Sequence, residues 1–127
     1  MSPATLRLLI DRARAASELA QARHGSARRA EDQARVHLTM LRQYAGEYGE
    51  RARARPGDSR DPSADRNQVV FLERLQVAID TQVLEVETRN RAAAAAAQEV
   101  SLCLQRYNVA VDGSRNSHAF VMSRGSN

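Results

Sequence analysis

The chain has 127 residues, enough for one small domain, and a formal net charge of +4 from 19 basic and 15 acidic residues. Every basic residue is arginine, alanine occurs 22 times, and only five residues are aromatic. So little bulky apolar material excludes a wide α/β core or an all-β sandwich, whereas a narrow helical structure needs only a stripe of apolar residues.

The sequence indicates a reducing compartment and no membrane span. The single cysteine, Cys103, cannot form an internal disulfide. The start of the chain lacks the basic and apolar segments of a secretory signal, and no apolar run approaches the roughly 20 residues of a spanning helix. We therefore expect a soluble, cytoplasmic protein.

The first predicted helix extends from about residue 3 to 55. No proline interrupts it after Pro3, which suits a helix start, and it is rich in alanine, arginine, leucine, glutamine and glutamate. Gly46 and Gly49 lie within it and each costs about 1 kcal/mol relative to alanine. They either loosen the helix or allow close approach of a partner.

A loop is predicted over residues 56–66, which include two prolines, a glycine and three aspartates. A second helix is predicted over residues 67–112, opened by a capping box of Asp65 and Gln68 and ended by Gly113. The tail, residues 113–127, has no seven-residue repeat and is rich in serine, glycine and asparagine. We expect it to be disordered.

Uncharged residues recur every seven positions in both predicted helices. In the first they are Leu6, Ala13, Ala20, Ala27, Ala34, Leu41 and Tyr48, and in the second Leu72, Ile79, Val86, Ala93, Val100 and Tyr107. The companion rows three residues further on are Leu9, Ala16, Arg23, Ala30, His37, Tyr44 and Arg51, and Leu75, Gln82, Arg89, Ala96, Cys103 and Ala110. Such a repeat over six or seven heptads is typical of a left-handed coiled coil.

These features predict an all-α fold, an antiparallel two-helix coiled-coil hairpin forming one domain over residues 1–112. About the loop, residues whose numbers add to roughly 122 should meet. This register places Arg23 opposite Glu99, either as an ion pair or as two solvated side chains. Because a hairpin buries only one stripe per helix, we expect the core to be completed by self-association or by a partner.

No constellation of residues points to catalysis. Cys103 lies in a predicted seam row and is best interpreted as a packed core residue. The three histidines have no cysteine or paired carboxylate at zinc-ligand spacing, and Asp58, Asp61 and Asp65 do not form a calcium loop. We therefore expect a protein that is not an enzyme, with no catalytic, cofactor-binding or metal-binding residues.

Charge is unevenly distributed. Residues 1–55 carry 11 arginines and 6 acids, and residues 56–127 carry 8 arginines and 9 acids. A basic helix is compatible with binding to nucleic acid, but the interleaved acids favour a solvated coiled-coil face. A basic hairpin that binds nucleic acid and a homodimeric four-helix scaffold remain competing hypotheses.

Two segments on opposite arms of the predicted hairpin carry paired motifs. Residues 41–48 read LRQYAGEY and residues 67–79 read NQVVFLERLQVAI. The first has the pattern L-x-x-Y-x-x-E-Y and the second the pattern F-x-x-x-L-x-x-A-I. Together they resemble the flagellar FliJ family of the bacterial type III export apparatus, and the resemblance extends from about residue 6 to 110.

The resemblance implies a stalk-like adaptor that works with the hexameric export ATPase and its regulator, the export gate protein FlhA and export chaperones. It implies a cytoplasmic protein held peripherally at the inner face of the cell membrane through the gate, and no nucleic-acid partner. A stalk protein of a virulence secretion system is the alternative within the same machinery. The implied partner-binding residues are Leu41, Tyr44, Tyr48, Phe71, Leu75 and Ala78.

The chain also departs from the family pattern. His37 occupies the position of a family glutamine, and Gln82 that of a family histidine. Family members usually continue the second helix well past the position of Val111. A helix that ended at residue 112 would leave the first turns of helix 3–55 without a partner, and in the family these paired ends enter the ATPase ring.

Overall fold

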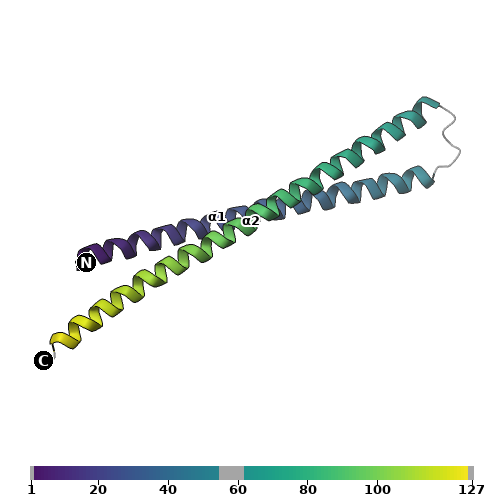
Figure 1. Ribbon diagram of the computed structural model, residues 1–127. Coiled ribbons are helices and arrows are strands. Elements are labelled where there is room, and N and C mark those ends of the chain that lie inside the picture. The colour runs from purple at the N-terminus through teal and green to yellow at the C-terminus, as the bar shows by residue number, and fades with distance from the viewer. Residues whose placement is uncertain (1, 55–61, 126–127) are drawn as a thin grey trace. The chain divides into compact units, whose positions relative to one another are not determined.

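The computed structural model describes the backbone of residues 2–54 and 62–125 and the side chains of residues 2–53 and 62–116. The described residues form two helices, α1 (Pro3–Ala54) and α2 (Pro62–Gly125), and contain no β-strand (Figure 1). Most of the predicted loop, with Asp58 and Asp61, lies outside the described residues. Neither described helix has a stretch long and apolar enough to cross a membrane.

Helix α1 begins where its capping residues place it. The Ser2 Oγ accepts a hydrogen bond from the Thr5 backbone N–H at 3.1 Å, and the Ser2 carbonyl accepts the first helical bond, from Leu6, at 3.0 Å. Pro3 occupies the first helical position, where no N–H is needed.

Helix α2 begins earlier and ends later than the sequence predicts. It starts at Pro62 rather than at residue 67, so Asp65 lies in its first turn, where a negative charge favours the helix dipole, and does not cap it. The helix continues through Gly113 to Gly125 rather than ending at residue 112. A glycine costs a helix only about 1 kcal/mol, and no proline follows to stop it.

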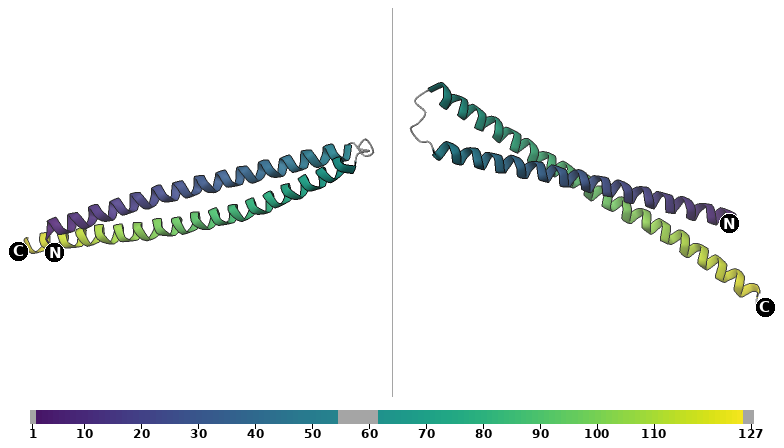
Figure 2. Two further views of the ribbon diagram at one scale, coloured as in Figure 1. Left: turned by 90° about the horizontal axis from the view of Figure 1, so that it is seen from above. Right: turned by 180° about the vertical axis from the view of Figure 1, so that it is seen from behind.

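The helices contribute to two compact units. The central unit comprises residues Arg28–Arg91, and the terminal unit comprises Met1–Ala27 with Ala92–Asn127. Within each unit a stretch of α1 runs alongside a stretch of α2 in the opposite direction (Figures 1 and 2). The predicted all-α, antiparallel two-helix coiled-coil hairpin is therefore confirmed.

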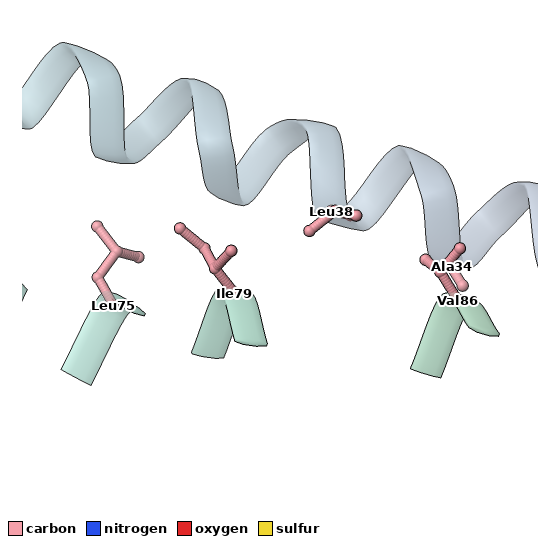
Figure 3. Packing of buried hydrophobic residues seen from close by; sticks show 5 residues of the cluster. All are labelled: Ala34, Leu38, Leu75, Ile79 and Val86. Atoms are coloured by element: carbon pink, nitrogen blue, oxygen red, sulfur yellow. The ribbon is translucent and has the colours of Figure 1, made fainter. Parts of the chain in front are cut away.

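The central unit holds the aliphatic core. Leu75 and Ile79 of α2 rise towards α1, and Ala34 lies against Val86 (Figure 3). Leu38 completes the buried cluster, and partly buried residues pack around it: Leu41, Ala45, Phe71 and Val83. None of the described side chains of the chain is completely buried, because two helices cannot enclose a residue on all sides.

The terminal unit has a core of small side chains. Ser17 and Ala20 of α1 and Ala93 and Cys103 of α2 are its buried residues. The Ser17 hydroxyl accepts a hydrogen bond from Gln21 Nε2 at 3.2 Å. Of the six consecutive alanines at 92–97, only Ala93 is buried, so most of this run lies on the surface.

The register of the coiled coil agrees closely with its prediction. In the central unit, Asn90 Nδ2 donates to Glu31 Oε2 at 2.9 Å, and in the terminal unit Arg14 lies 3.5 Å from the Tyr107 hydroxyl and over its ring. Both pairs of residue numbers add to 121, against the predicted 122. Gln82 Nε2 adds a cross-helix hydrogen bond to the Ala34 carbonyl at 3.0 Å.

The seven-residue rows from Leu6 and from Leu72 are confirmed, since every member is buried or half-buried. The companion row predicted for α1 is wrong, because all its members except Ala30 are exposed. The row that faces α2 lies one position later, at Ile10, Ser17, His24, Glu31, Leu38, Ala45 and Ala52. The observed second row follows the row from Leu6 by four residues instead of three. This spacing leaves the predicted row facing water, which avoids the cost of burying its two arginines, Arg23 and Arg51.

This shift also decides the expected contact between Arg23 and Glu99. Arg23 lies on the exposed row, and no ion pair between the two side chains forms. Glu99 instead accepts a hydrogen bond from the Cys103 thiol at 3.5 Å. The solvated arrangement of Arg23 is therefore the one observed.

Truncation of Leu38 tests the shifted row. Because Leu38 is only 9% exposed and belongs to the central cluster, Leu38→Ala should lower the free energy of unfolding by about 2–4 kcal/mol. Met40→Ala, at a side chain 62% exposed on the same helix, should change it by less than about 0.5 kcal/mol. Denaturant titration followed by circular dichroism measures both, and equal losses would contradict the seam assignment.

Acid should weaken the central unit through Glu31. Hydrogen bonds from Asn90 and Arg35 lower the pKa of this carboxyl below its ordinary value of 4.5. A lowered pKa in the folded state stabilises the fold at pH values above the unfolded pKa, and this contribution disappears as the pH falls through the folded pKa. Glu31→Gln should therefore flatten the dependence of stability on pH below about 4.5.

A matched control separates this effect from general acid denaturation. Glu73 is exposed and has no hydrogen bond or ion pair with the described residues, so Glu73→Gln should leave the pH dependence as in the wild type. Melting temperatures measured from pH 3 to pH 7 make the comparison. A Glu31→Gln profile that coincides with the wild-type profile would overturn the assignment.

Candidate functional site

The six residues implied as partner-binding all lie in the central unit, but they differ in exposure. Leu75 is buried in the core, and Tyr44 is 47% exposed. The other four are half-buried: Leu41, Tyr48, Phe71 and Ala78. Leu75 therefore supports the site from beneath, and Tyr44 has the largest surface available to a partner.

An aromatic cluster joins the two helices at this site. The ring of Tyr48 lies 4.6 Å from that of Phe71, and the ring of Tyr44 meets Phe71 edge-on at 6.1 Å. Both distances lie in the range of favourable aromatic pairs. Phe71 also packs against the aliphatic core, so the core holds the three rings in place.

A shallow groove adjoins the exposed ring of Tyr44. Residues of α1 at helical spacing line it: His37, Met40, Leu41, Gln43, Tyr44 and Glu47. Met40 is 62% exposed, and Gln43 Nε2 donates to Glu47 Oε1 at 3.4 Å along the rim. The groove thus combines an aromatic face, a flexible thioether and a carboxylate.

Sequence reasoning missed Met40, Gln43 and Glu47 as members of the site. A signal was present, because residues 37, 40, 41, 44 and 47 share one face of a helix. The seam prediction concealed it by assigning Tyr44 and His37 to the buried companion row. The four-residue step in α1 turns both side chains outwards.

The two departures from the family pattern have different surroundings. Gln82 is half-buried, and its amide N–H donates a hydrogen bond from α2 to the Ala34 carbonyl of α1. His37 is exposed and lines the groove beside Tyr44. Gln82 therefore has a structural contact, whereas His37 is accessible to a partner.

Cys103 has the surroundings of a packed core residue, as predicted. It is 5% exposed, and burial, with the nearby Glu99 carboxylate, raises the pKa of its thiol. A neutral, buried thiol is a poor nucleophile. Among residues 2–53 and 62–116, no three histidine, cysteine, aspartate or glutamate side chains gather as metal ligands would.

Comparison with known proteins identifies one family. The family model described as flagellar FliJ protein matches residues 1–111. No curated protein and no solved structure matches the chain.

The exposures of the aromatic residues predict separable effects on stability. Tyr48→Ala should lower the free energy of unfolding by about 1–2 kcal/mol, because its half-buried ring packs against Phe71. Tyr44→Ala should cost less than about 1 kcal/mol, since its ring is exposed and only touches Phe71 edge-on. Thermal unfolding of both variants measures the difference, and an equal or larger loss for Tyr44→Ala would contradict this geometry.

Proposed function

This chain belongs to the flagellar FliJ family, and on that basis we propose that it is a stalk-like adaptor between the export ATPase, the export gate and the export chaperones. The family is a non-enzymatic component of flagellar protein export. The proposed adaptor works in the cytoplasm, at the inner face of the membrane where it meets the gate. The match to the family carries this proposal.

The proposed gate-binding surface is the groove with the aromatic cluster. Its centre is the exposed ring of Tyr44, flanked by His37 and Met40. Tyrosine is enriched among residues that dominate binding energies, because it offers a large amphipathic area with few torsions to fix. Half-buried surface is added by Leu41, Tyr48, Phe71 and Ala78, and Leu75 belongs to the buried cluster against which Phe71 packs.

The proposed contact with the ATPase and its regulator uses the terminal unit. The extension of α2 to Gly125 supports this proposal, because α2 continues past the position that the register pairs with the start of α1. Met1–Ala27 and Ala92–Asn127 cluster in one unit, and Arg14 contacts Tyr107 across the helices. This pairing supports a contact of both termini with one partner.

Binding to the cytoplasmic part of the gate tests the adaptor role. We expect Tyr44→Ala to weaken binding of the full chain to FlhA by about tenfold or more, with little loss of stability. The matched control is Val36→Ala, which truncates an exposed side chain on the same helix outside the groove and should bind normally. Calorimetry or surface plasmon resonance measures the affinities.

The result can also contradict the proposal. Wild-type protein that does not bind the gate would remove the gate from the list of partners, and undiminished binding of Tyr44→Ala would remove the groove assignment. A virulence secretion stalk is distinguished by its neighbouring genes, because a flagellar adaptor is expected beside genes of the flagellar export ATPase.

A further inference from the structure

An apolar stripe lies on the outer face of α2 in the central unit. Val70, Val77 and Leu84 follow each other at seven-residue spacing and are 43%, 63% and 63% exposed. Val77 lies two residues from each of the core residues Leu75 and Ile79, so it is turned by about 200° from both. The stripe therefore faces away from α1, and the hairpin leaves it uncovered.

A row of acids runs beside the stripe. Glu73, Asp80 and Glu87 are exposed and also recur every seven residues, each three or four positions from a stripe residue. The ion pairs among the described residues are Arg35 with Glu31 and Arg89 with Glu85. None of the three acids beside the stripe forms an ion pair with a described arginine. Of these three acids, Asp80 alone has a hydrogen-bond partner among the described residues, Gln76 Nε2 at 2.9 Å.

The threonines on the other flank of the stripe need no hydrogen-bond acceptor from a partner. The hydroxyls of Thr81 and Thr88 donate to the carbonyls of Val77 and Leu84, at 2.8 and 3.0 Å. Their donors are satisfied within the helix, so contact with an apolar side chain costs little. The face as a whole has the pattern of one half of a coiled coil, with an apolar row and a charged border.

From this pattern we propose that the outer face of α2 binds an amphipathic helix of another protein, whose apolar heptad row is bordered by lysine or arginine. A second copy of the chain fits poorly. An antiparallel symmetric pair would set the acidic row against itself, and a parallel pair would offer one arginine, Arg74, to three acids. A basic helix both covers the stripe and neutralises the row.

Two designed peptides can probe this face on the full-length protein. Each has about 21 residues and the same leucine heptads, but one carries lysine and the other glutamate at the flanking positions. Fluorescence anisotropy should show that the lysine peptide binds and that added salt weakens this binding. The affinity for the glutamate peptide should be lower by a factor of about ten or more. The triple variant Glu73→Gln, Asp80→Asn, Glu87→Gln should remove most of this difference.

Variants of the stripe locate the binding. The double variant Val77→Asp, Leu84→Asp should bind the lysine peptide about tenfold or more weakly, because the substitutions place charge in the apolar contact. Leu102→Asp alters an exposed leucine of α2 in the terminal unit and should bind normally. Circular dichroism should show unchanged helicity, because all three side chains are exposed. If Val77→Asp with Leu84→Asp unfolds the chain, Val77→Gln with Leu84→Gln takes its place.

Three results would overturn the proposal. The first is equal binding of the two peptides, and the second is undiminished binding to the stripe variant. The third is a wild-type dimer in sedimentation that the stripe variant loses, which would assign the face to a second copy. Tyr44→Ala should bind the lysine peptide normally, so failure of the gate-binding role and failure of this inference are distinguishable.

Discussion

In the described part of the chain, each of the two helices has only the other against which to bury apolar surface. The buried set is accordingly narrow, and in the central unit it consists of one alanine and four aliphatic residues. In the terminal unit it is smaller still, with Ser17, Ala20, Ala93 and Cys103. Because one stripe per helix is all that can be covered, residues beyond the stripe must either tolerate water or meet a partner.

Polar contacts across the helices favour one register. Glu31 and Asn90 pair at the exposed edge of the seam, and the half-buried Gln82 donates to the Ala34 carbonyl. In an aliphatic seam, sliding by a heptad would cost little, whereas separating Gln82 from Ala34 would leave a part-buried donor and acceptor without partners. No buried side-chain nitrogen or oxygen lacks a partner in the described part of the chain, so hydrogen bonds offset the cost of removing these polar groups from water.

The same constraint creates two surfaces on the central unit. The groove beside Tyr44 belongs to α1, and the stripe of Val70, Val77 and Leu84 belongs to α2. The half-buried Phe71 contacts Tyr44 of the first, and the core residues Leu75 and Ile79 lie on the opposite face of α2 from the second. The two helices of the central unit can therefore offer two surfaces of different chemistry to two partners. One is an aromatic groove, and the other is an apolar stripe with an acidic border.

The sequence by itself determined the helical class, the antiparallel pairing, the register, the first row of α1 and, apart from the exposed Arg89, both rows of α2. A seven-residue repeat and one proline-rich break leave few alternatives. The sequence did not determine the second row of α1. The rows that begin at Leu9 and at Ile10 each carry four apolar or aromatic residues of seven, so composition could not choose between them. Only packing against α2 decided this, by turning the arginine-bearing row to water, burying Leu38 and leaving Glu31 half-buried. That rotation also exposed Tyr44, and so the site depends on a choice between adjacent positions that the amino-acid pattern leaves open.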